Sequence, residues 1–356
     1  MSSFENIIQK YRDTSFSERD KGYRFEKLVQ SFLKTYPLYE NEFTDVWLWK
    51  EFPSNRDFGA GEKDSGIDLV ARTKYGDYWA VQCKCYQEDA AIDKPKVDTF
   101  LSTSGKSFYD TREAGKKVNF TYRLWIDTTQ KGFNREAESA IQNQTPQVGR
   151  IGYYDLLQAP VDWQKLDKGI SGGKAANKKY DPKPHQQKAI DDVHRYLQTR
   201  ERGKLIMACG TGKTFTSLRI AENETAGRGT ILFLVPSIAL LGQTLREWSA
   251  HSRYPLYPIC ICSDAGVSKS ASKTGDVSAA GIIDLALPAS TDIKNITRQY
   301  DFARRSQTRE GGMLAVFSTY QSIDVISEVQ KSINRQSKDG FVFDLIICDE
   351  AHRTTG

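Results

Sequence analysis

The stretch Met207-Ala208-Cys209-Gly210-Thr211-Gly212-Lys213-Thr214 decides the fold of the second half of the chain. It follows an apolar run at 204–207 and precedes a helical run at 215–222, which is the strand, loop and helix order of a phosphate-binding loop. Glycines let backbone N–H groups turn toward phosphate oxygens, and the helix N-terminus adds its positive dipole end. We therefore expect Gly210, Thr211 and Gly212 to surround phosphates, Lys213 to contact the β and γ phosphates, and Thr214 to hold Mg²⁺.

A second motif lies at the other end of this block, where the apolar run 345–348 leads into Asp349-Glu350-Ala351-His352. Strand-like runs at 204–207, 231–235, 259–262, 314–317 and 345–348 alternate with helical stretches, which predicts a parallel α/β sheet. The carboxyl ends of parallel strands meet at one edge, so the two carboxylates should face the phosphate-binding loop. We expect Asp349 to hold Mg²⁺ through water and Glu350 to orient or deprotonate an attacking water.

Together these motifs resemble superfamily 2 helicases and translocases of the DEAH-box kind. The resemblance implies a RecA-like domain that binds ATP, with Gln186 of the Lys183-Pro184-His185-Gln186-Gln187 stretch as the adenine reader and Gln187 as the fallback. It also implies that Ser237 and Thr319, which follow strand-like runs, contact a nucleic-acid backbone. Ser and Thr after a strand are more often simple helix caps, so capping and backbone contact both stay open for these two residues.

The first half of the chain carries a different pattern, two β-rich runs at 66–72 and 78–86 around a short turn with Gly76. They predict a hairpin. With a loop of Tyr75, Gly76 and Asp77, Asp68 lies directly opposite Lys84, and the period of two places Gln82 on the same face. A bulge in either strand would break this register.

An acid, an amide and a lysine on one face suit phosphodiester cleavage. Oxygen ligands from Asp68 and Gln82 bind Mg²⁺, which polarises the phosphate and lowers the pKa of a water, while Lys84 stabilises charge or assists that water. Glu26 is a further candidate ligand, because it flanks the apolar stripe of a helix predicted at 22–33 and can reach the sheet. Asp127, at the end of a predicted strand, serves the site or caps the turn that follows it.

Gly22-Tyr23-Arg24-Phe25-Glu26, Gly66-Ile67-Asp68 and Val81-Gln82-Cys83-Lys84 together resemble the Mrr-like branch of the PD-(D/E)xK nucleases. In that branch Gln replaces the acidic residue of the last motif. The resemblance covers about residues 19–155 and implies a restriction-endonuclease-like mixed sheet. The competing interpretation is an ordinary cross-strand ion pair between Asp68 and Lys84 on a solvated face, and such pairs contribute only ~0.2–1 kcal/mol.

Composition divides the chain between these two blocks. The 356 residues are 39% hydrophobic and 27% charged, which predicts a folded protein of two domains, and the net charge of +5 permits an anionic partner without requiring one. The stretch 168–184 contains three Gly, two Pro and five Lys residues, and we interpret residues 166–182 as a linker between a nuclease domain at 1–165 and a motor domain at 183–356. Part of 263–312 is expected to be a loop.

The fold class is therefore α/β, with a mixed-sheet domain followed by a RecA-like domain. A nuclease in front of a superfamily 2 motor resembles the N-terminal half of Type ISP restriction-modification enzymes, with Mg²⁺ and ATP as cofactors and double-stranded DNA as substrate. The resemblance places a second RecA-like domain, a methyltransferase and target recognition downstream of residue 356.

The first residues lack the pattern of a signal peptide, and no apolar run is long enough to span a membrane, so we expect a cytoplasmic protein. Two rival functions stay open. One is a repair or phage-defence helicase-nuclease. The other is a motor whose first domain binds DNA without cutting it.

Overall fold

In the computed structural model the chain divides into two compact units, Met1–Asn177 and Lys178–Gly356. The structure describes residues 3–59, 66–142, 144–176, 179–263, 281–335 and 340–351. His352 of the second motif therefore lies outside the described residues. Within these ranges no helix combines the length and apolarity needed to cross a membrane.

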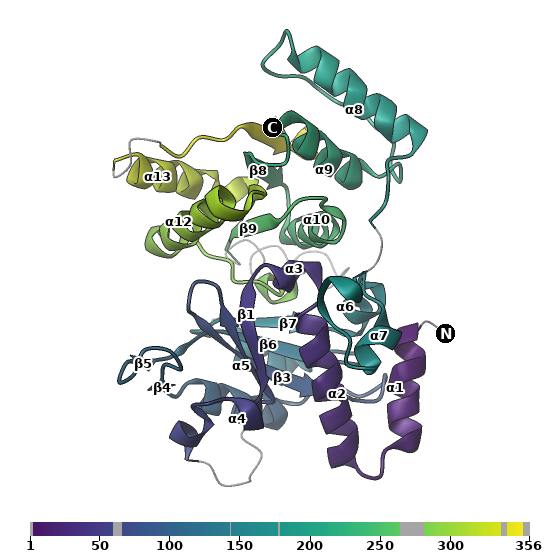
Figure 1. Ribbon diagram of the computed structural model, residues 1–356, viewed down its shortest axis with the longest axis vertical. Coiled ribbons are helices and arrows are strands. Elements are labelled where there is room, and N and C mark those ends of the chain that lie inside the picture. Colours follow the sequence, from purple (N-terminus) through teal and green to yellow (C-terminus); the bar gives the residue numbers. More distant parts are fainter. Residues whose placement is uncertain are drawn as a thin grey trace. The chain divides into compact units, whose positions relative to one another are not determined.

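Unit 1 is built on a five-stranded mixed sheet in the order β1-β2-β3-β6-β7 (Figure 1). Strands β1, β2 and β3 are antiparallel, whereas β3, β6 and β7 are parallel. The strands are β1 (Phe43–Leu48), β2 (Leu69–Thr73), β3 (Tyr78–Lys84), β6 (Phe120–Asp127) and β7 (Val148–Ile151), with a small separate pair of β4 (Phe108–Tyr109) and β5 (Lys117–Val118). The helices are α1 (Ser3–Thr14), α2 (Glu18–Leu33), α3 (Pro37–Glu40), α4 (Lys94–Ser104), α5 (Arg135–Ile141), α6 (Tyr153–Gln158) and α7 (Trp163–Asp167), with 3-10 turns η1 (Trp49–Glu51), η2 (Asn55–Phe58) and η3 (Gly172–Lys174).

Helices cover both faces of this sheet. On one face Trp79 of β3 meets Tyr39 of α3, and α2 packs on β1 and β3. On the other face Trp125 of β6 meets Phe100 of α4. Because Gln82 pairs in register with Trp125, and side chains alternate along a strand, Gln82 points to the α4 face.

Helix α2 begins at Glu18, earlier than the predicted start at Gly22, because the Ser17 side chain accepts a hydrogen bond from the Asp20 N–H and caps the helix. Its predicted apolar stripe is buried in full: Phe25, Leu28, Val29, Phe32 and Leu33.

The predicted linker starts too early. Leu166 and Ala175 are buried, and the Gly172 N–H donates to Thr35 Oγ1 at 2.8 Å, so residues 166–176 pack onto unit 1. Gly169 and Gly172 have φ of +76° and +71° with open space around them, so they form turns, which composition alone does not distinguish from a flexible connection.

Unit 2 is built on a four-stranded parallel sheet in the order β11-β8-β10-β9. The strands are β8 (Thr230–Val235), β9 (Leu256–Ile261), β10 (Met313–Thr319) and β11 (Leu345–Cys348). The helices are α8 (Pro184–Leu197), α9 (Lys213–Glu224), α10 (Ile238–His251), α12 (Ile293–Glu310) and α13 (Ile323–Asn334), with 3-10 turns η5 (Ile282–Leu285) and η6 (Tyr320–Ser322). A mixed-sheet unit followed by a parallel-sheet unit confirms the predicted fold class.

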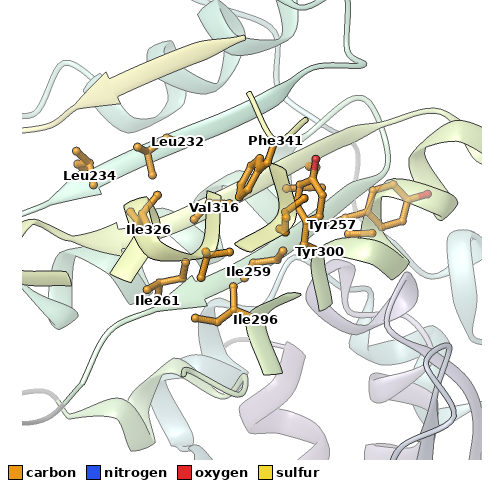
Figure 2. Packing of buried hydrophobic residues seen from close by; sticks show 14 residues of the cluster. Leu232, Leu234, Tyr257, Ile259, Ile261, Ile296, Tyr300, Val316, Ile326 and Phe341 are labelled. Atoms are coloured by element: carbon orange, nitrogen blue, oxygen red, sulfur yellow. The ribbon is translucent and has the colours of Figure 1, made fainter. Parts of the chain in front are cut away.

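The sheet of unit 2 is packed on both faces. Figure 2 shows one face, where α12 and α13 close a cluster that includes Leu232, Val316, Ile326 and Phe341. On the other face Trp248 of α10 packs edge-on against Phe233 and Phe317. Phe233 follows Leu232 on β8, and Phe317 follows Val316 on β10. Alternate residues of β8 and β10 thus serve the two layers, as expected for a parallel sheet that is buried on both sides.

One expectation for unit 2 differs from the structure. Residues 204–207 are not a strand: Leu205 and Ile206 are exposed, because this run is paired with no strand among the described residues. Of the segment 263–312, residues 264–280 lie outside the described ranges, and Ile293–Glu310 is the helix α12.

Candidate functional site

The hairpin of unit 1 has a different register from the predicted one. Arg72 pairs with Tyr78 and Leu69 with Val81, so that Asp68, next along, comes opposite Gln82 instead of Lys84. The loop is Lys74, Tyr75 and Gly76, closed by the Thr73 N–H donating to the Asp77 carbonyl at 2.8 Å. Gly76 has φ +88° and takes the last loop position, where three-residue hairpin loops need a left-handed residue. The observed pairing of β2 with β3 differs from the predicted pairing by two residues. Because side chains alternate with a period of two, each residue still points to the predicted face of the sheet.

Asp68 and Gln82 are in direct contact in this structure. Gln82 Nε2 donates to Asp68 Oδ2 at 2.5 Å, and the backbone N–H of Cys83 donates to the same oxygen at 2.7 Å. A carboxylate accepts hydrogen bonds only, so the amide nitrogen must face Asp68 and the amide carbonyl must face away. Gln82 is 1% exposed, and its Oε1 is buried with no hydrogen-bond partner.

Lys84 ends strand β3 and is half-buried. Its partner in the parallel register is Asp127 of β6, which is fully buried. Asp127 accepts from Arg150 Nε at 2.8 Å and from the Thr129 N–H at 3.0 Å, so it both forms an ion pair and caps the turn after β6. Burial raises the pKa of the Asp127 carboxyl, and the hydrogen bonds from Arg150 oppose that rise.

Glu26 comes to strand β3 from the α2 face. Burial raises the pKa of the Cys83 thiol, and the charges of Asp68 and Glu26 raise it further, whereas Lys84 lowers it. These three charged groups therefore lie close enough to act on one side chain.

The donor set at this end of the sheet fits Mg²⁺. Among the described residues, no group of three or more His, Cys, Asp and Glu side chains is gathered closely enough to hold a metal ion. What the structure offers instead is the Asp68 carboxylate and, on the side of the Gln82 amide turned away from it, an amide oxygen that lacks a hydrogen-bond partner. Mg²⁺ prefers oxygen ligands and keeps several waters, so one carboxylate and one amide oxygen suit it.

The phosphate-binding loop of unit 2 has the expected backbone. Gly210 and Gly212 have φ of +75° and +81°, values that favour glycine, and α9 begins at Lys213. Thr211 closes the loop on itself, with its Oγ1 donating to the Ala208 carbonyl at 2.7 Å. Lys213 and Thr214 therefore stand in the first turn of a helix, where backbone N–H groups are available to an anion.

The two carboxylates after β11 lie beside this loop. Lys213 Nζ donates to Glu350 Oε1 at 3.0 Å, and this bond is the main reason that the pKa of Lys213 is raised. The Glu350 N–H donates to Asp349 Oδ1 at 3.1 Å. Glu350 has φ +51°, which is uncommon for a residue other than glycine. Lys213, Asp349 and Glu350 are thus brought together from opposite ends of the domain sequence.

The two glutamine candidates for adenine recognition have other partners here. Gln186 is buried, with its Oε1 accepting from the Lys183 N–H at 2.9 Å and its Nε2 donating to the Thr211 carbonyl at 3.0 Å. Gln187 is exposed and donates to Asp191 on its own helix at 2.8 Å. Gln186 therefore ties α8 to the phosphate-binding loop in this structure.

The two candidate DNA contacts are also engaged within the fold. Ser237 is exposed and caps α10, its Oγ accepting from the Leu240 N–H at 3.3 Å. Thr319 is only 5% exposed, and its hydroxyl lies 3.4 Å from Ser322 Oγ. The exposed side chain of that segment is Gln321.

Two residues beside the ATP-binding motifs were not singled out from sequence. Trp248 Nε1 donates to the Thr214 carbonyl at 3.2 Å, and the Tyr320 hydroxyl donates to the Asp349 carbonyl at 2.8 Å. Tyr320 belongs to the stretch Ser318-Thr319-Tyr320-Gln321, which the sequence analysis had compared with a strand-end motif. Its hydrogen bond to the Asp349 carbonyl, however, joins two strands that are far apart in sequence, and no local pattern predicts it.

Comparison with known proteins agrees with this geometry. Residues 34–172 match the family described as a restriction endonuclease of the Mrr type, and residues 179–356 match the family described as Type III restriction enzyme, res subunit. The chain thus has a nuclease domain followed by a helicase-like domain, which confirms the predicted resemblance.

Three individual proteins are similar to this chain over part or all of its length. Over its whole length the chain is 31% identical to the ATP-dependent Type ISP restriction-modification enzyme LlaBIII bound to DNA, with a TM-score of 0.75, and covers 20% of that enzyme's chain. Over 49% of its length it is 40% identical to a nuclease-deletion mutant of the Type ISP enzyme LlaGI, with a TM-score of 0.38 and 15% of that chain covered. Over 172 residues it is 30% identical to the probable helicase A859L of African swine fever virus, of which it spans 16%.

Proposed function

We propose that this chain, which belongs to the family of Type III restriction enzyme res subunits, is the nuclease and first motor domain of an ATP-dependent restriction endonuclease. Unit 1 cuts double-stranded DNA with Mg²⁺, and unit 2 binds ATP and drives translocation along DNA. The chain spans about a fifth of the Type ISP enzyme that it matches over its full length. DNA as the substrate is supported by that relative, which is bound to DNA.

The observation that carries the nuclease proposal is the buried Oε1 of Gln82, which has no hydrogen-bond partner, beside Asp68. Leaving a buried acceptor unpaired costs about 1–3 kcal/mol, and a cation bound at this strand end would remove that cost. A divalent cation bound there would polarise a phosphate and acidify a water. The hydrogen bond from Gln82 to Asp68 supports this site over the alternative of a solvated cross-strand ion pair.

The residues of this site have separate tasks. Asp68 and Gln82 hold the cation, with Glu26 as a further carboxylate from α2. Lys84, at the half-buried end of β3, faces the same side of the sheet as Gln82 and places positive charge near the scissile phosphate. The ion pair of Asp127 with Arg150 holds the neighbouring strand end.

In unit 2 the proposed ATP site consists of the loop glycines, Lys213 and Thr214, with Asp349 as the second contact to magnesium and Glu350 acting on water. Lys213 binds Glu350 in this structure, so a γ-phosphate would exchange with that carboxylate and release it. This exchange provides a physical reason for Glu350 to become available when ATP binds.

The test separates the two sites. Supercoiled plasmid is incubated with excess protein and Mg²⁺, and nicking is followed for the parent and for Lys84→Ala, Lys213→Ala and the control Lys27→Ala, an exposed lysine on α2. We expect Lys84→Ala to lose at least about 10² in rate, as for removal of other groups that stabilise transition-state charge, with Mg·ATP binding unchanged. Lys213→Ala should lose Mg·ATP binding and keep nicking.

Nicking by Lys84→Ala at the parental rate would contradict the assignment of this site. If the parent binds plasmid but does not nick it with Mg²⁺ or Mn²⁺, unit 1 binds DNA without cutting it, which is the rival function.

A further inference from the structure

A row of polar side chains crosses the carboxyl edge of the sheet of unit 1. Gln82 of β3 pairs in register with Trp125 of β6, and Trp125 pairs with Arg150 of β7. Residues in register on neighbouring parallel strands share a face, so Arg150 points to the α4 face, like Gln82. Two residues further along, Lys84 and Asp127 end β3 and β6 and point to the same face. The row that begins at the proposed nuclease site therefore continues to β7.

Asp127 lies where it could capture Lys84. Neighbouring strands are about 4.8 Å apart, a distance that the side chain of a lysine spans easily. The Asp127 side chain is fully buried, and a buried carboxylate needs a cation beside it. An ion pair between these two residues would hold the Lys84 ammonium on the sheet and keep it from a DNA phosphate.

Arg150 holds the Asp127 carboxylate instead. Arg150 Nε donates to Asp127 Oδ2 at 2.8 Å, and Arg150 Nη2 donates to Asp127 Oδ1 at 3.0 Å. The Thr129 N–H donates to the same Oδ1 at 3.0 Å. Both oxygens are thus bonded in the bidentate geometry that suits a guanidinium. Within the described part of the chain, the Lys84 ammonium forms no hydrogen bond and no ion pair.

The fold confines the Arg150 guanidinium to this position. A Cβ added at Gly132 would lie 3.0 Å from Arg150 Nη1, and one added at Gly152 would lie 3.1 Å from Arg150 Cζ. The centroid of the Phe133 ring lies 5.5 Å from the same Cζ. Two glycines and an aromatic ring therefore surround a side chain that is only 19% exposed.

We propose that Arg150 is a positioning residue of the nuclease: by occupying both oxygens of Asp127, it keeps the Lys84 ammonium unpaired and available to the scissile phosphate. This inference rests on the proposed function of unit 1. Asp68, on the strand at the other side of β3, is likewise bonded to another donor, Gln82 Nε2. Both acids that flank Lys84 on this face are therefore occupied.

The first test is plasmid nicking with Mg²⁺ and excess protein. Arg150→Gln frees Asp127 to bind Lys84, and we expect the nicking rate to fall by at least about tenfold, the worth of one hydrogen bond between charged groups. Adding Asp127→Asn removes the competing charge, so the double variant should return to within about threefold of the parent. The control Arg112→Gln breaks a 2.8 Å ion pair with Asp45 elsewhere in unit 1 and should nick like the parent.

The second test detects the same competition without nuclease activity. The melting temperature in EDTA is measured for Lys84→Ala in the parent and in Arg150→Gln. In Arg150→Gln the lysine is the new partner of Asp127, so its removal should lower the melting temperature by at least about 3 °C more than in the parent. If Arg150→Gln does not fold, Arg150→Lys replaces it in both tests, because one ammonium cannot hold both carboxylate oxygens as a guanidinium does.

Three results would overturn the proposal. They are parental nicking by Arg150→Gln, a double variant as slow as Arg150→Gln, and an equal effect of Lys84→Ala on melting in both backgrounds. A parent that does not nick with Mg²⁺ or Mn²⁺ would instead refute the proposed nuclease function, on which the melting comparison does not depend.

Discussion

Gln82→Glu tests the proposed metal site through stability alone. The substitution replaces the amide that donates to Asp68 with a carboxyl group, so two acids meet where the structure has a 2.5 Å hydrogen bond. Without metal, two adjacent negative charges cannot be accommodated, and the introduced carboxyl keeps its proton to donate to Asp68. With Mg²⁺, both carboxyl groups can ionise and bind the cation.

The size of the effect follows from the cost of keeping that proton. The ordinary pKa of a Glu is about 4.3, and each pH unit above it costs about 1.36 kcal/mol, which limits the loss to roughly 2 kcal/mol at pH 6 and roughly 5 kcal/mol at pH 8. The folded-state pKa is raised above the unfolded value, so stability falls as pH rises. For a unit of this size 1 kcal/mol corresponds to about 2–4 °C. We expect a decrease of about 5 °C at pH 6 and about 10 °C or more at pH 8.

Tryptophan fluorescence is a suitable assay, because five of the six Trp residues lie in unit 1 (Trp47, Trp49, Trp79, Trp125 and Trp163). Melting is followed in EDTA and in about 10 mM Mg²⁺ at both pH values. Mg²⁺ should restore most of the loss in Gln82→Glu.

The control is Gln30→Glu, since Gln30 Nε2 also bonds a backbone carbonyl and a carboxylate, those of Val46 and Glu51. It should be destabilised without rescue by Mg²⁺. The reasoning is refuted if Gln82→Glu melts with the parent in EDTA at pH 8, or if Mg²⁺ fails to restore it.

Two further predictions concern folding and DNA affinity. Gly66→Ala should destabilise unit 1 by about 2–4 kcal/mol in urea denaturation, because Gly66 has φ +73° and an added Cβ would lie 2.8 Å from the Phe100 nitrogen; an unchanged midpoint would contradict this packing. Duplex binding by this chain should show no sequence preference and weaken by about 10³ between roughly 50 and 200 mM salt, as for roughly six phosphate contacts. Anisotropy titrations measure it, and sequence-selective binding that persists at high salt would contradict it.

The sequence was most informative where chemistry and spacing are local. The phosphate-binding loop is contiguous, and its glycines adopt the positive φ that the motif requires. Strand β11 has the bounds that its apolar run indicates, Leu345–Cys348. The parallel sheet followed from the alternation of strand-like and helical runs, and the mixed sheet from the resemblance to Mrr-like nucleases. The fold class could therefore be predicted without knowledge of any long-range contact.

The hairpin register shows how one backbone angle limits such reasoning. The sequence contains Gly76 but does not state its φ, and placing it in the middle of the loop shifted the pairing by two residues. The face of Asp68 was still predicted correctly because an even shift keeps side chains on the same side. Its direct partner, Gln82, could not be obtained without the true register.

Other features depend on contacts that no local pattern encodes. Residues 204–207 have the composition of a strand, but a strand also needs a partner, and the described residues supply none. Thr319 was a reasonable backbone contact from its place after a strand, yet the turn buries it. Tyr320 acquires its significance only from a carbonyl that is 29 residues away in sequence.

The central claim, a cation held by Asp68 and Gln82, is tested most directly by titrating the chain with Mn²⁺ in the absence of nucleotide and counting bound ions by electron paramagnetic resonance. We predict about one tightly bound Mn²⁺ in the parent and in Asp349→Asn, and loss of that ion in Asp68→Asn, whose melting in EDTA serves as the check on folding. Binding that survives in Asp68→Asn, or that is lost in Asp349→Asn instead, would place the cation elsewhere and contradict the proposed nuclease site.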